Sequence, residues 1–275
     1  MANTIDWGQA AVNNTNGFGK APTNNTIDFG EVCSDSWSPE TNLTGAGGTP
    51  SFSNTQSTEY DGMDAYVAMG DVLDFDRLDA FSISCWFKRG GVATEFLVDK
   101  SEDSGDYRGY SILIPNTDNK IYFTLRRTLT DFIQVKSNTA ITNTDWHNLV
   151  ITYSGSSLTS GVNIYIDNVN DTGTGTGTLS GSTITAQPLQ IGARNGANNF
   201  LGKIDEVSIF NSELSASDIT SIYNSGAAND ISSLSPLSWW RCGDNDTSPT
   251  LTDNGSGGND GTMTNFTTFS TDVPT

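Results

Sequence analysis

Phe81-Ser82-Ile83-Ser84-Cys85-Trp86-Phe87 is the stretch of this chain that says most about its fold. The side chains of Phe81, Ile83, Cys85 and Phe87 fall at every second position, so they share one face of an extended strand. This period of two is typical of a β-strand that packs one face into a core. We therefore predict a core strand here, with an unpaired, buried thiol at Cys85.

Outward from this stretch, many short segments have the composition of strands separated by polar turns. We predict strands at 65–69, 95–99, 110–114, 120–125, 131–136, 146–153, 162–166, 188–191 and 203–210. The Thr/Gly alternation of residues 172–178 predicts a flexible loop or an edge segment. Strands at this spacing favour an all-β fold, namely a two-layer antiparallel jelly-roll sandwich.

One short helix interrupts this pattern after residue 214. Ser215 is a typical N-cap, and Asp218 follows three residues later, as in a capping box. Ile219 and Tyr223 lie on one helical face, and Gly226 is expected to end the helix. The sequence therefore predicts about two helical turns beside the sheets.

The composition excludes some classes of partner. Formal net charge is −19, from 32 acidic and 13 basic residues. Phosphates would repel such a chain, so we expect no nucleic-acid partner. No apolar run reaches the roughly 18 residues of a membrane helix, so we expect no membrane contact. The three cysteines, at 33, 85 and 242, match no zinc-binding spacing.

The N-terminal part contains a short repeat. Trp7, Phe18 and Phe29 are 11 residues apart, and each is followed by glycine. One such unit cannot bury its aromatic ring alone, so the units must stack on one another or on other chains. We predict a β stem shared by several chains, most simply a trimer, or a docking arm. An unstructured Asn/Thr-rich tail is the alternative.

These patterns divide the chain into four parts. Residues 1–36 hold the repeats, and residues 37–56 have the Ser/Thr/Gly/Pro composition of a linker. Residues 57–232 hold the predicted sandwich. Residues 233–275 form a C-terminal extension that completes or flanks it, either in the same subunit or on a neighbouring one.

Residues 60–226 resemble the laminin-G-like and pentraxin-like domains of the concanavalin A-like lectins and glucanases. Five stretches carry the resemblance in the order found in that family: 81–88, 145–153, 162–167, 189–194 and 202–210. The resemblance implies a jelly-roll fold and a binding or structural role. The repeats, this domain and the Gly/Thr/Asn-rich tail together look similar to virion structural proteins of marine bacteriophages.

The sequence offers little support for catalysis. Related glucanases place an acid and a nucleophile on one face of a strand, about 5 Å apart. Here Asp205 and Glu206 are adjacent, so we expect them to point to opposite faces. His147 is the only histidine, and the resemblance implies a structural role for it. We therefore predict that the protein is not an enzyme.

Calcium is the metal that the resemblance implies. Related folds bind a structural calcium through an aspartate of the last strand, and Asp205 occupies that position. Asp64, in a loop near the first predicted strands, is a second candidate, because calcium takes six to eight oxygen ligands. A surface aspartate that caps a turn is the alternative for either residue.

Two loops have the composition of a glycan-binding site. Tyr107, Arg108 and Tyr110 follow two aspartates, and residues 195–199 contain three asparagines. Ordinary loop composition is the alternative for both.

The expected function is that of a non-enzymatic virion protein: a capsid decoration, head fibre or tail-associated protein. It would display the sandwich at the virion surface, contact other virion proteins and bind host-surface polysaccharide. We expect synthesis in the host cytoplasm, since residues 1–6 do not resemble a secretion signal. The alternatives are a free carbohydrate-binding or adhesion module and, less favoured, a glycosidase.

Overall fold

The computed structural model describes residues 52–266 and 269–275. The chain divides into residues 1–51 and 52–275, and the second unit is the subject here. The predicted repeat aromatics Trp7, Phe18 and Phe29 lie outside the described residues, as does most of the predicted linker.

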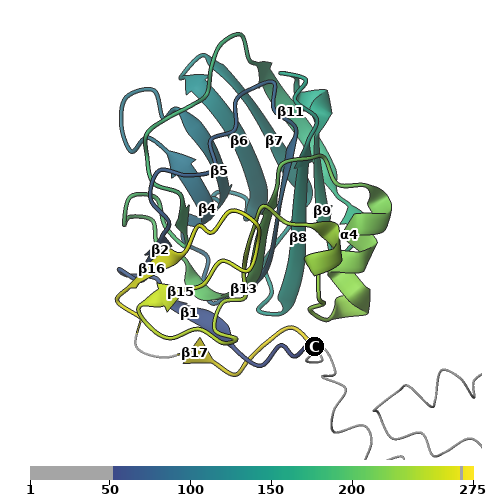
Figure 1. Cartoon of the computed structure of the whole chain (residues 1–275). Coiled ribbons are helices and arrows are strands. Elements are labelled where there is room, and N and C mark those ends of the chain that lie inside the picture. Colours follow the sequence, from purple (N-terminus) through teal and green to yellow (C-terminus); the bar gives the residue numbers. More distant parts are fainter. Residues whose placement is uncertain (1–51, 267–268) are drawn as a thin grey trace, which may run out of the picture. The chain divides into compact units, whose positions relative to one another are not determined.

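Two antiparallel sheets pack face to face, as Figure 1 shows. The eight-stranded sheet has the order β10-β9-β8-β3-β13-β1-β17, with β14 also paired to β13. Its strands are β1 (Ser57–Asp61), β3 (Phe81–Arg89), β8 (Trp146–Tyr153), β9 (Val162–Ile166), β10 (Val169–Asn170), β13 (Leu201–Phe210), β14 (Ser238–Trp240) and β17 (Phe269–Ser270).

The nine-stranded sheet has the order β11-β7-β6-β5-β4-β12-β2-β16-β15. Its strands are β2 (Tyr66–Ala68), β4 (Glu95–Ser101), β5 (Gly109–Ile114), β6 (Lys120–Thr128), β7 (Asp131–Ala140), β11 (Thr172–Thr178), β12 (Gln190–Ile191), β15 (Thr250–Leu251) and β16 (Gly261–Thr264). The predicted all-β, two-layer antiparallel class is confirmed. The uncertain segment 172–178 forms an edge strand, β11, which pairs with β7.

The core lies between the two sheets and is built from the alternating side chains. Phe81, Ile83, Cys85 and Phe87 all point into it and are no more than 1% exposed. Cys85 is unpaired, as predicted, and burial raises the pKa of its thiol to about 12. The thiol is therefore neutral and acts as a small apolar side chain.

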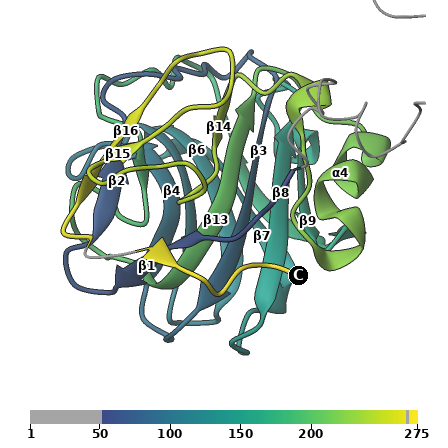
Figure 2. The ribbon, with the colours of Figure 1, turned by 60° about the horizontal axis from the view of Figure 1, so that its bottom comes forward.

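A second, smaller apolar cluster covers the outer face of the eight-stranded sheet. Helix α4 (Ala216–Tyr223) contributes Ile219 and Ile222, which pack with Val150 of β8 and Phe210 of β13. Figure 2 shows α4 beside β8 and β9. The capping box of Ser215 and Asp218 is present as predicted. Asn224, in the left-handed conformation, rather than Gly226 caps the C-terminal end of the helix.

The C-terminal extension adds its strands to the same sandwich. β14 pairs with β13, β16 pairs with β2, and β17 pairs with β1. Residues just before β1 also pack on this body, since Phe52 stacks on Trp239 at 6.2 Å between ring centroids. Short 3₁₀ turns lie at Thr159–Gly161, Asn224–Gly226 and Ser232–Leu234. Among the described residues, no helix has the length and apolar character needed to cross a membrane.

Candidate functional site

The outer face of the eight-stranded sheet is not covered over its whole length. Beyond the last turn of α4, a row of side chains runs across three strands. Trp86 of β3 lies opposite Asn148 of β8. The Asp167 N–H, after β9, donates to the Asn148 carbonyl, and the Asn148 N–H donates to the Asp167 carboxylate. Tyr223, at the end of α4, stacks on Trp86 with ring centroids 5.9 Å apart. The end of the helix therefore forms one wall above a polar row.

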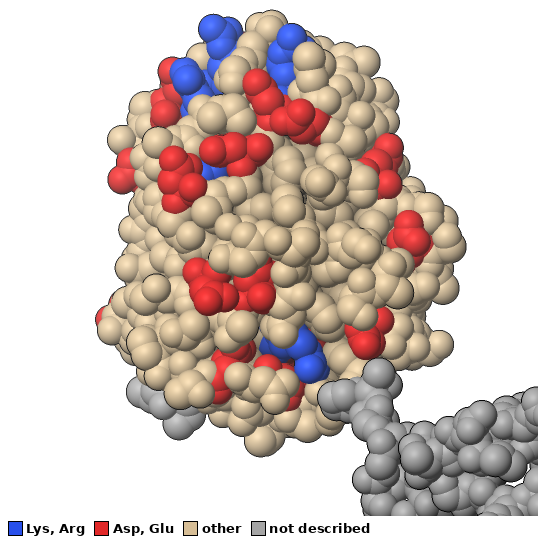
Figure 3. Space-filling model, viewed as in Figure 1, with Lys and Arg blue, Asp and Glu red and all other residues tan. Residues whose placement is uncertain are grey.

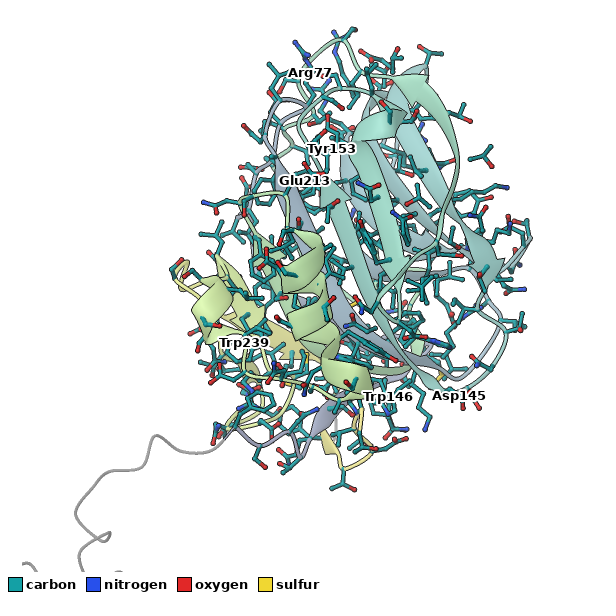
Figure 4. The ribbon with its side chains drawn as sticks, turned by 90° about the vertical axis from the view of Figure 1, so that its right-hand side faces the viewer. Arg77, Asp145, Trp146, Tyr153, Glu213 and Trp239 are labelled. Atoms are coloured by element: carbon teal, nitrogen blue, oxygen red, sulfur yellow. The ribbon has the colours of Figure 1, made fainter. Side chains whose placement is uncertain are left out.

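A hollow of about 370 Å³ lies at this place. Its lining includes three aromatic side chains, Trp86, Trp146 and Tyr223, with the carboxylates of Asp145 and Asp167. Figure 4 shows Asp145 and Trp146 just beyond the end of the helix, with Trp239 on its other side. This volume falls within the range of about 300 to 1,000 Å³ that is common for small-ligand sites.

The C-terminal segment fixes the far wall of the hollow. The indole N–H of Trp146 donates to Asp272 Oδ1 at 2.9 Å, and the ammonium of Lys88 lies 2.8 Å from Asp272 Oδ2. Burial acts to raise the pKa of Asp272, but the hydrogen bonds from Lys88 and Trp146 outweigh it and lower the pKa. Asp272 is therefore ionised at neutral pH and holds both side chains in place.

Asn148 carries the unusual feature of this site. It lies between Trp86 and Asp167, which both line the hollow, and it is 0% exposed. Neither its amide nitrogen nor its amide oxygen has a hydrogen-bond partner among the described residues. A buried amide without partners costs about 1 to 3 kcal/mol, and Asn148 lies behind the wall of the hollow rather than in its lining.

An adjoining hollow of about 380 Å³ shares Asp167. His147 lines it, with Nδ1 2.7 Å from Asp167 Oδ2 and Nε2 2.7 Å from Asn143 Oδ1. Both ring nitrogens are thus occupied. His147 thereby helps to orient the carboxylate of Asp167, which both hollows share.

The prediction that Asp205 and Glu206 point to opposite faces is wrong. A bulge in β13 falls between its pairings at Asp205 and Ser208, and Glu206 adopts a φ of 47°. The extra residue turns both carboxyls toward the α4 side. There Glu206 accepts hydrogen bonds from Trp239 and Arg241, and Asp205 accepts one from Asn54 at 2.9 Å.

Both carboxyls are nearly inaccessible, at 0% and 5% exposure. Burial, with the adjoining charge of Glu206, raises the pKa of Asp205 well above its ordinary value. Burial also raises the pKa of Glu206 to about 7, although Arg241 opposes it. Neither carboxyl lines either of the two hollows described above.

The two predicted calcium ligands are not brought together. Asp61 lies opposite Leu201 in the β1–β13 pairing, and Asp64 lies beyond Asp61. Asp205 is four residues further along β13, or about 13 Å away at strand spacing. Among the described residues, no group of three acidic, histidine or cysteine side chains is placed to hold one ion. Asp205 has one further side-chain oxygen nearby, the unpartnered Oδ1 of Asn54.

The predicted glycan-binding residues separate in the structure. Tyr110 is 2% exposed and packs in the core, where its hydroxyl donates to the Leu73 carbonyl at 3.1 Å. It therefore does not fit the role of a ligand contact. Tyr107 is partly exposed, 5.5 Å from the guanidinium of Arg194. Arg108 Nε lies 3.4 Å from the Arg127 carbonyl.

Sequence reasoning missed the hollow beside α4. Trp86 and Trp146 both stand in the stretches that identify the fold, but each was assigned to a strand and not to a site. The signal was present, because Trp86 falls on the face of its strand opposite to Phe81, Ile83 and Cys85. A tryptophan on the face away from the core needs a cover or a ligand.

Comparisons with known proteins agree with this architecture. The sequence pattern of the concanavalin A-like lectin/glucanases superfamily matches residues 61–220. A candidate carbohydrate-binding protein from Bacteroides ovatus has a TM-score of 0.59 at 13% identity, over 81% of this chain and 62% of that chain. A heptameric SAP-like pentraxin from Limulus polyphemus has a TM-score of 0.47 at 12% identity, over 62% and 82% of the two chains.

This chain therefore spans about three-fifths of the length of the Bacteroides structure. No curated protein sequence matches it. At these identities the similarity to solved structures concerns the fold alone.

Proposed function

The chain belongs to the concanavalin A-like lectin/glucanase superfamily, and we propose that it is a non-enzymatic carbohydrate-binding protein that takes a sugar in the hollow beside α4. The observation that carries this proposal is the hollow of about 370 Å³ whose walls combine aromatic rings with the carboxylates of Asp145 and Asp167. Superfamily membership supports the class of ligand. The Bacteroides structure, itself described as a candidate carbohydrate-binding protein, points in the same direction.

The chemistry of the hollow suits a pyranose ring. Such a ring has apolar C–H faces, which can pack on the partly exposed rings of Trp146 and Tyr223. Its hydroxyls are donors, and the carboxylates of Asp145 and Asp167 can accept hydrogen bonds from them. A purely apolar ligand would offer these carboxylates no donor.

A glycan microarray with the full-length chain tests this proposal. We expect binding to at least one neutral glycan, and titration should then show weakening of tenfold or more in Trp146→Ala and in Asp145→Asn. Asp145 is exposed, so its substitution should not disturb folding. Phe132→Ala is the matched control, because it removes a partly exposed ring from the outer face of the other sheet. Absence of glycan binding, or equal binding by all variants, contradicts the proposal.

The assignment as a binding protein rests on the placement of the acidic groups. A glycosidase needs two accessible carboxyls on either side of the scissile bond. Asp205 and Glu206 are adjacent in space but enclosed, and Asp167 is bound by His147 and by the Asn148 N–H. Incubation of the protein with the glycan that it binds should release no reducing ends. Measured release would overturn the non-enzymatic assignment while leaving binding intact.

We also propose that the sandwich is displayed on a virion surface, as a capsid decoration, head fibre or tail-associated protein. The support is the sequence alone: the 11-residue repeat with Trp7, Phe18 and Phe29, and the similarity of the arrangement to phage structural proteins. The repeats would hold a trimer together or dock it to other virion proteins, and the sandwich would meet host-surface polysaccharide.

Light scattering of the full-length chain tests the shared stem. We expect a trimer that dissociates when Trp7, Phe18 and Phe29 are all replaced by alanine. The sandwich should keep its melting temperature, since residues 52–275 form a separate unit. A full-length chain that stays monomeric contradicts the stem, and purified particles that lack the chain contradict the virion role.

Calcium is proposed at Asp205 and not at Asp64. The support is a buried region with three carboxyls, Asp205, Glu206 and Asp244, against one guanidinium, Arg241, together with the free Asn54 Oδ1. Such an excess of buried negative charge favours either protonation or a cation. Thermal melting should rise with calcium in the native chain and not in Asp205→Asn. An unchanged melting temperature with calcium and with a chelator would exclude the ion.

A further inference from the structure

The hollow beside α4 and the adjoining hollow have one wall in common, which Asp167 forms. This carboxylate lines both hollows, whose volumes are about 370 Å³ and about 380 Å³. The adjoining hollow lies at the end of β7 and the β9–β10 turn, since Ala140 and Val169 line it. Both volumes are near the lower end of the range of about 300 to 1,000 Å³ for small-ligand sites, which suits one sugar unit in each hollow.

Hydrogen bonds join the two hollows a second time, through the segment before β8. Asn143 lines the adjoining hollow, and its amide Nδ2 donates at 2.8 Å to Oδ2 of Asp145, which lines the hollow beside α4. The Asn143 amide oxygen lies 2.7 Å from Nε2 of His147, whose Nδ1 lies 2.7 Å from Asp167 Oδ2. The chain Asp145–Asn143–His147–Asp167 therefore connects the two linings and holds both carboxylates in place.

The adjoining hollow offers the contacts that a further sugar ring needs. Val169 is 65% exposed, so its methyl groups can pack on the C–H face of a ring. Thr142 is exposed, and its hydroxyl can donate to a sugar hydroxyl or accept from one. Asp171 accepts two bonds from Thr139, at 2.8 Å each, but a carboxylate has about four acceptor positions. The adjoining hollow thus combines an apolar contact with free donors and acceptors.

The charges of the two linings disfavour an acidic ligand. The linings contain three aspartates, and their basic side chains are Lys88 and His147. Both basic groups are already paired, because the Lys88 ammonium lies 2.8 Å from Asp272 Oδ2 and His147 contacts Asp167. Figure 3 shows Asp and Glu spread along one face of the molecule, with Lys and Arg mainly near its two ends. With a net charge of −19 as well, the chain would repel a sugar carboxylate or sulfate.

We propose that the two hollows form one site for a neutral oligosaccharide of at least two sugar units, with Asp167 between the units. The class of ligand rests on the function proposed above, whereas its length rests on the contacts that join the hollows. A single sugar would fill one hollow only. A second linked unit adds the contacts of the other hollow without a second full loss of translational freedom, so it should raise the affinity.

Calorimetric titration of the full-length chain with sugars of increasing length tests the extended site. The probes are the mono-, di- and trisaccharides of the cello-, malto-, manno- and galacto-oligosaccharide series, and trigalacturonate is the acidic probe. We expect at least one neutral series in which the disaccharide binds about tenfold or more tightly than the monosaccharide. We expect no binding of trigalacturonate.

A double variant, Thr142→Ala with Val169→Ala, removes contacts of the adjoining hollow alone. It should weaken binding of the disaccharide about tenfold and leave binding of the monosaccharide unchanged. The matched control is Thr144→Ala with Val92→Ala, because Thr144 is exposed like Thr142 and Val92 is 63% exposed. Neither control residue lines a hollow, so we expect no change.

Two outcomes overturn the extended site: equal affinity for sugars of every length, or equal weakening by the two double variants. Binding of trigalacturonate as tight as that of the neutral trisaccharides overturns the neutral class. Melting temperatures identify a variant that fails to fold, and Val169→Ala alone then replaces the double variant. If the monosaccharide binds and Trp146→Ala weakens it while length has no effect, the proposed function stands and the extended site falls. If no sugar binds at any length, both fall.

Discussion

Two regions of the sandwich, one in each sheet, differ in how far their outer faces are covered. β3, in the eight-stranded sheet, is buried on both faces at every position except the partly exposed Lys88, because α4 and the C-terminal segment cover it. β7, in the nine-stranded sheet, alternates between buried and partly exposed residues over its first half. The outer face around β3, the covered face, therefore acts as a second core, whereas the outer face around β6 and β7, the bare face, keeps polar and cationic side chains at the surface.

This difference explains where the hollow arises. On the covered face, a hollow forms where the cover ends and leaves the rings of Trp146 and Tyr223 partly exposed. On the bare face, the guanidiniums of Arg126 and Arg194 lie against aromatic rings. A polar group without partners is costly on the covered face, where water is excluded. It costs little on the bare face, where water can bond to it.

Removal of an anchor from the cover should have the largest effect. Ile219→Ala takes a 1% exposed side chain from beneath α4, and we expect a loss of about 2 to 5 kcal/mol in the free energy of unfolding. Phe132→Ala on the bare face should cost less than about 1 kcal/mol, since its ring is partly in water. Urea denaturation measures both values. Similar losses would show that the two faces do not differ as described.

The pH dependence of stability should differ in sign between the faces. Since the pKa of Glu206 is raised to about 7 from 4.5, the folded state holds a proton that the unfolded state loses first. The contribution of Glu206 to the free energy of unfolding is therefore fully present below about pH 4.5. It declines by up to about 3 kcal/mol as pH rises through 7. Glu206→Gln should flatten this decline in denaturation series from pH 4 to pH 8.

On the bare face, Asp118 behaves in the opposite way. Burial acts to raise the pKa of Asp118, but hydrogen bonds from Tyr122 and the Lys120 N–H outweigh it and lower the pKa. Its contribution is present above its ordinary pKa and is lost as pH falls. Asp118→Asn should thus weaken the protein by less than about 1 kcal/mol at pH 7 and have no effect at low pH. If Glu206→Gln and Asp118→Asn changed the pH dependence of stability in the same direction, the two faces would not differ in this way.

The smallest effects concern single hydroxyls. The side chains of Ser84 and Ser208 are buried on the covered face without hydrogen-bond partners among the described residues. Ser208→Ala should therefore leave stability unchanged or raise it by up to about 1 kcal/mol. On the bare face, Thr124 accepts a bond from Gln134 at 2.9 Å, so Thr124→Val should lower stability by about 0.5 kcal/mol. Thermal melting of the two variants should shift in opposite directions, and a destabilising Ser208→Ala would indicate an unseen partner.

Much of the fold could be predicted because its signals are local. The alternation at 81–87 and the limits of β8 and β9 agree with the structure, since a strand that buries one face must alternate. The cap at Ser215 is equally local, being made by Asp218 three residues later. The same reasoning failed for Asp205 and Glu206, because a bulge depends on how β13 pairs with β3 and not on its own residues.

The sequence by itself determined the class of fold, the buried thiol of Cys85 and the net acidity. Each of these follows from neighbouring residues or from composition. Only the tertiary structure decided that Tyr110 faces the core and that Asn148 lies without partners beside Trp86. The physical reason is that these contacts join residues far apart in the chain, Tyr110 with Leu73 and Asn148 with Trp86, and such pairings are set by the packing of the whole sandwich.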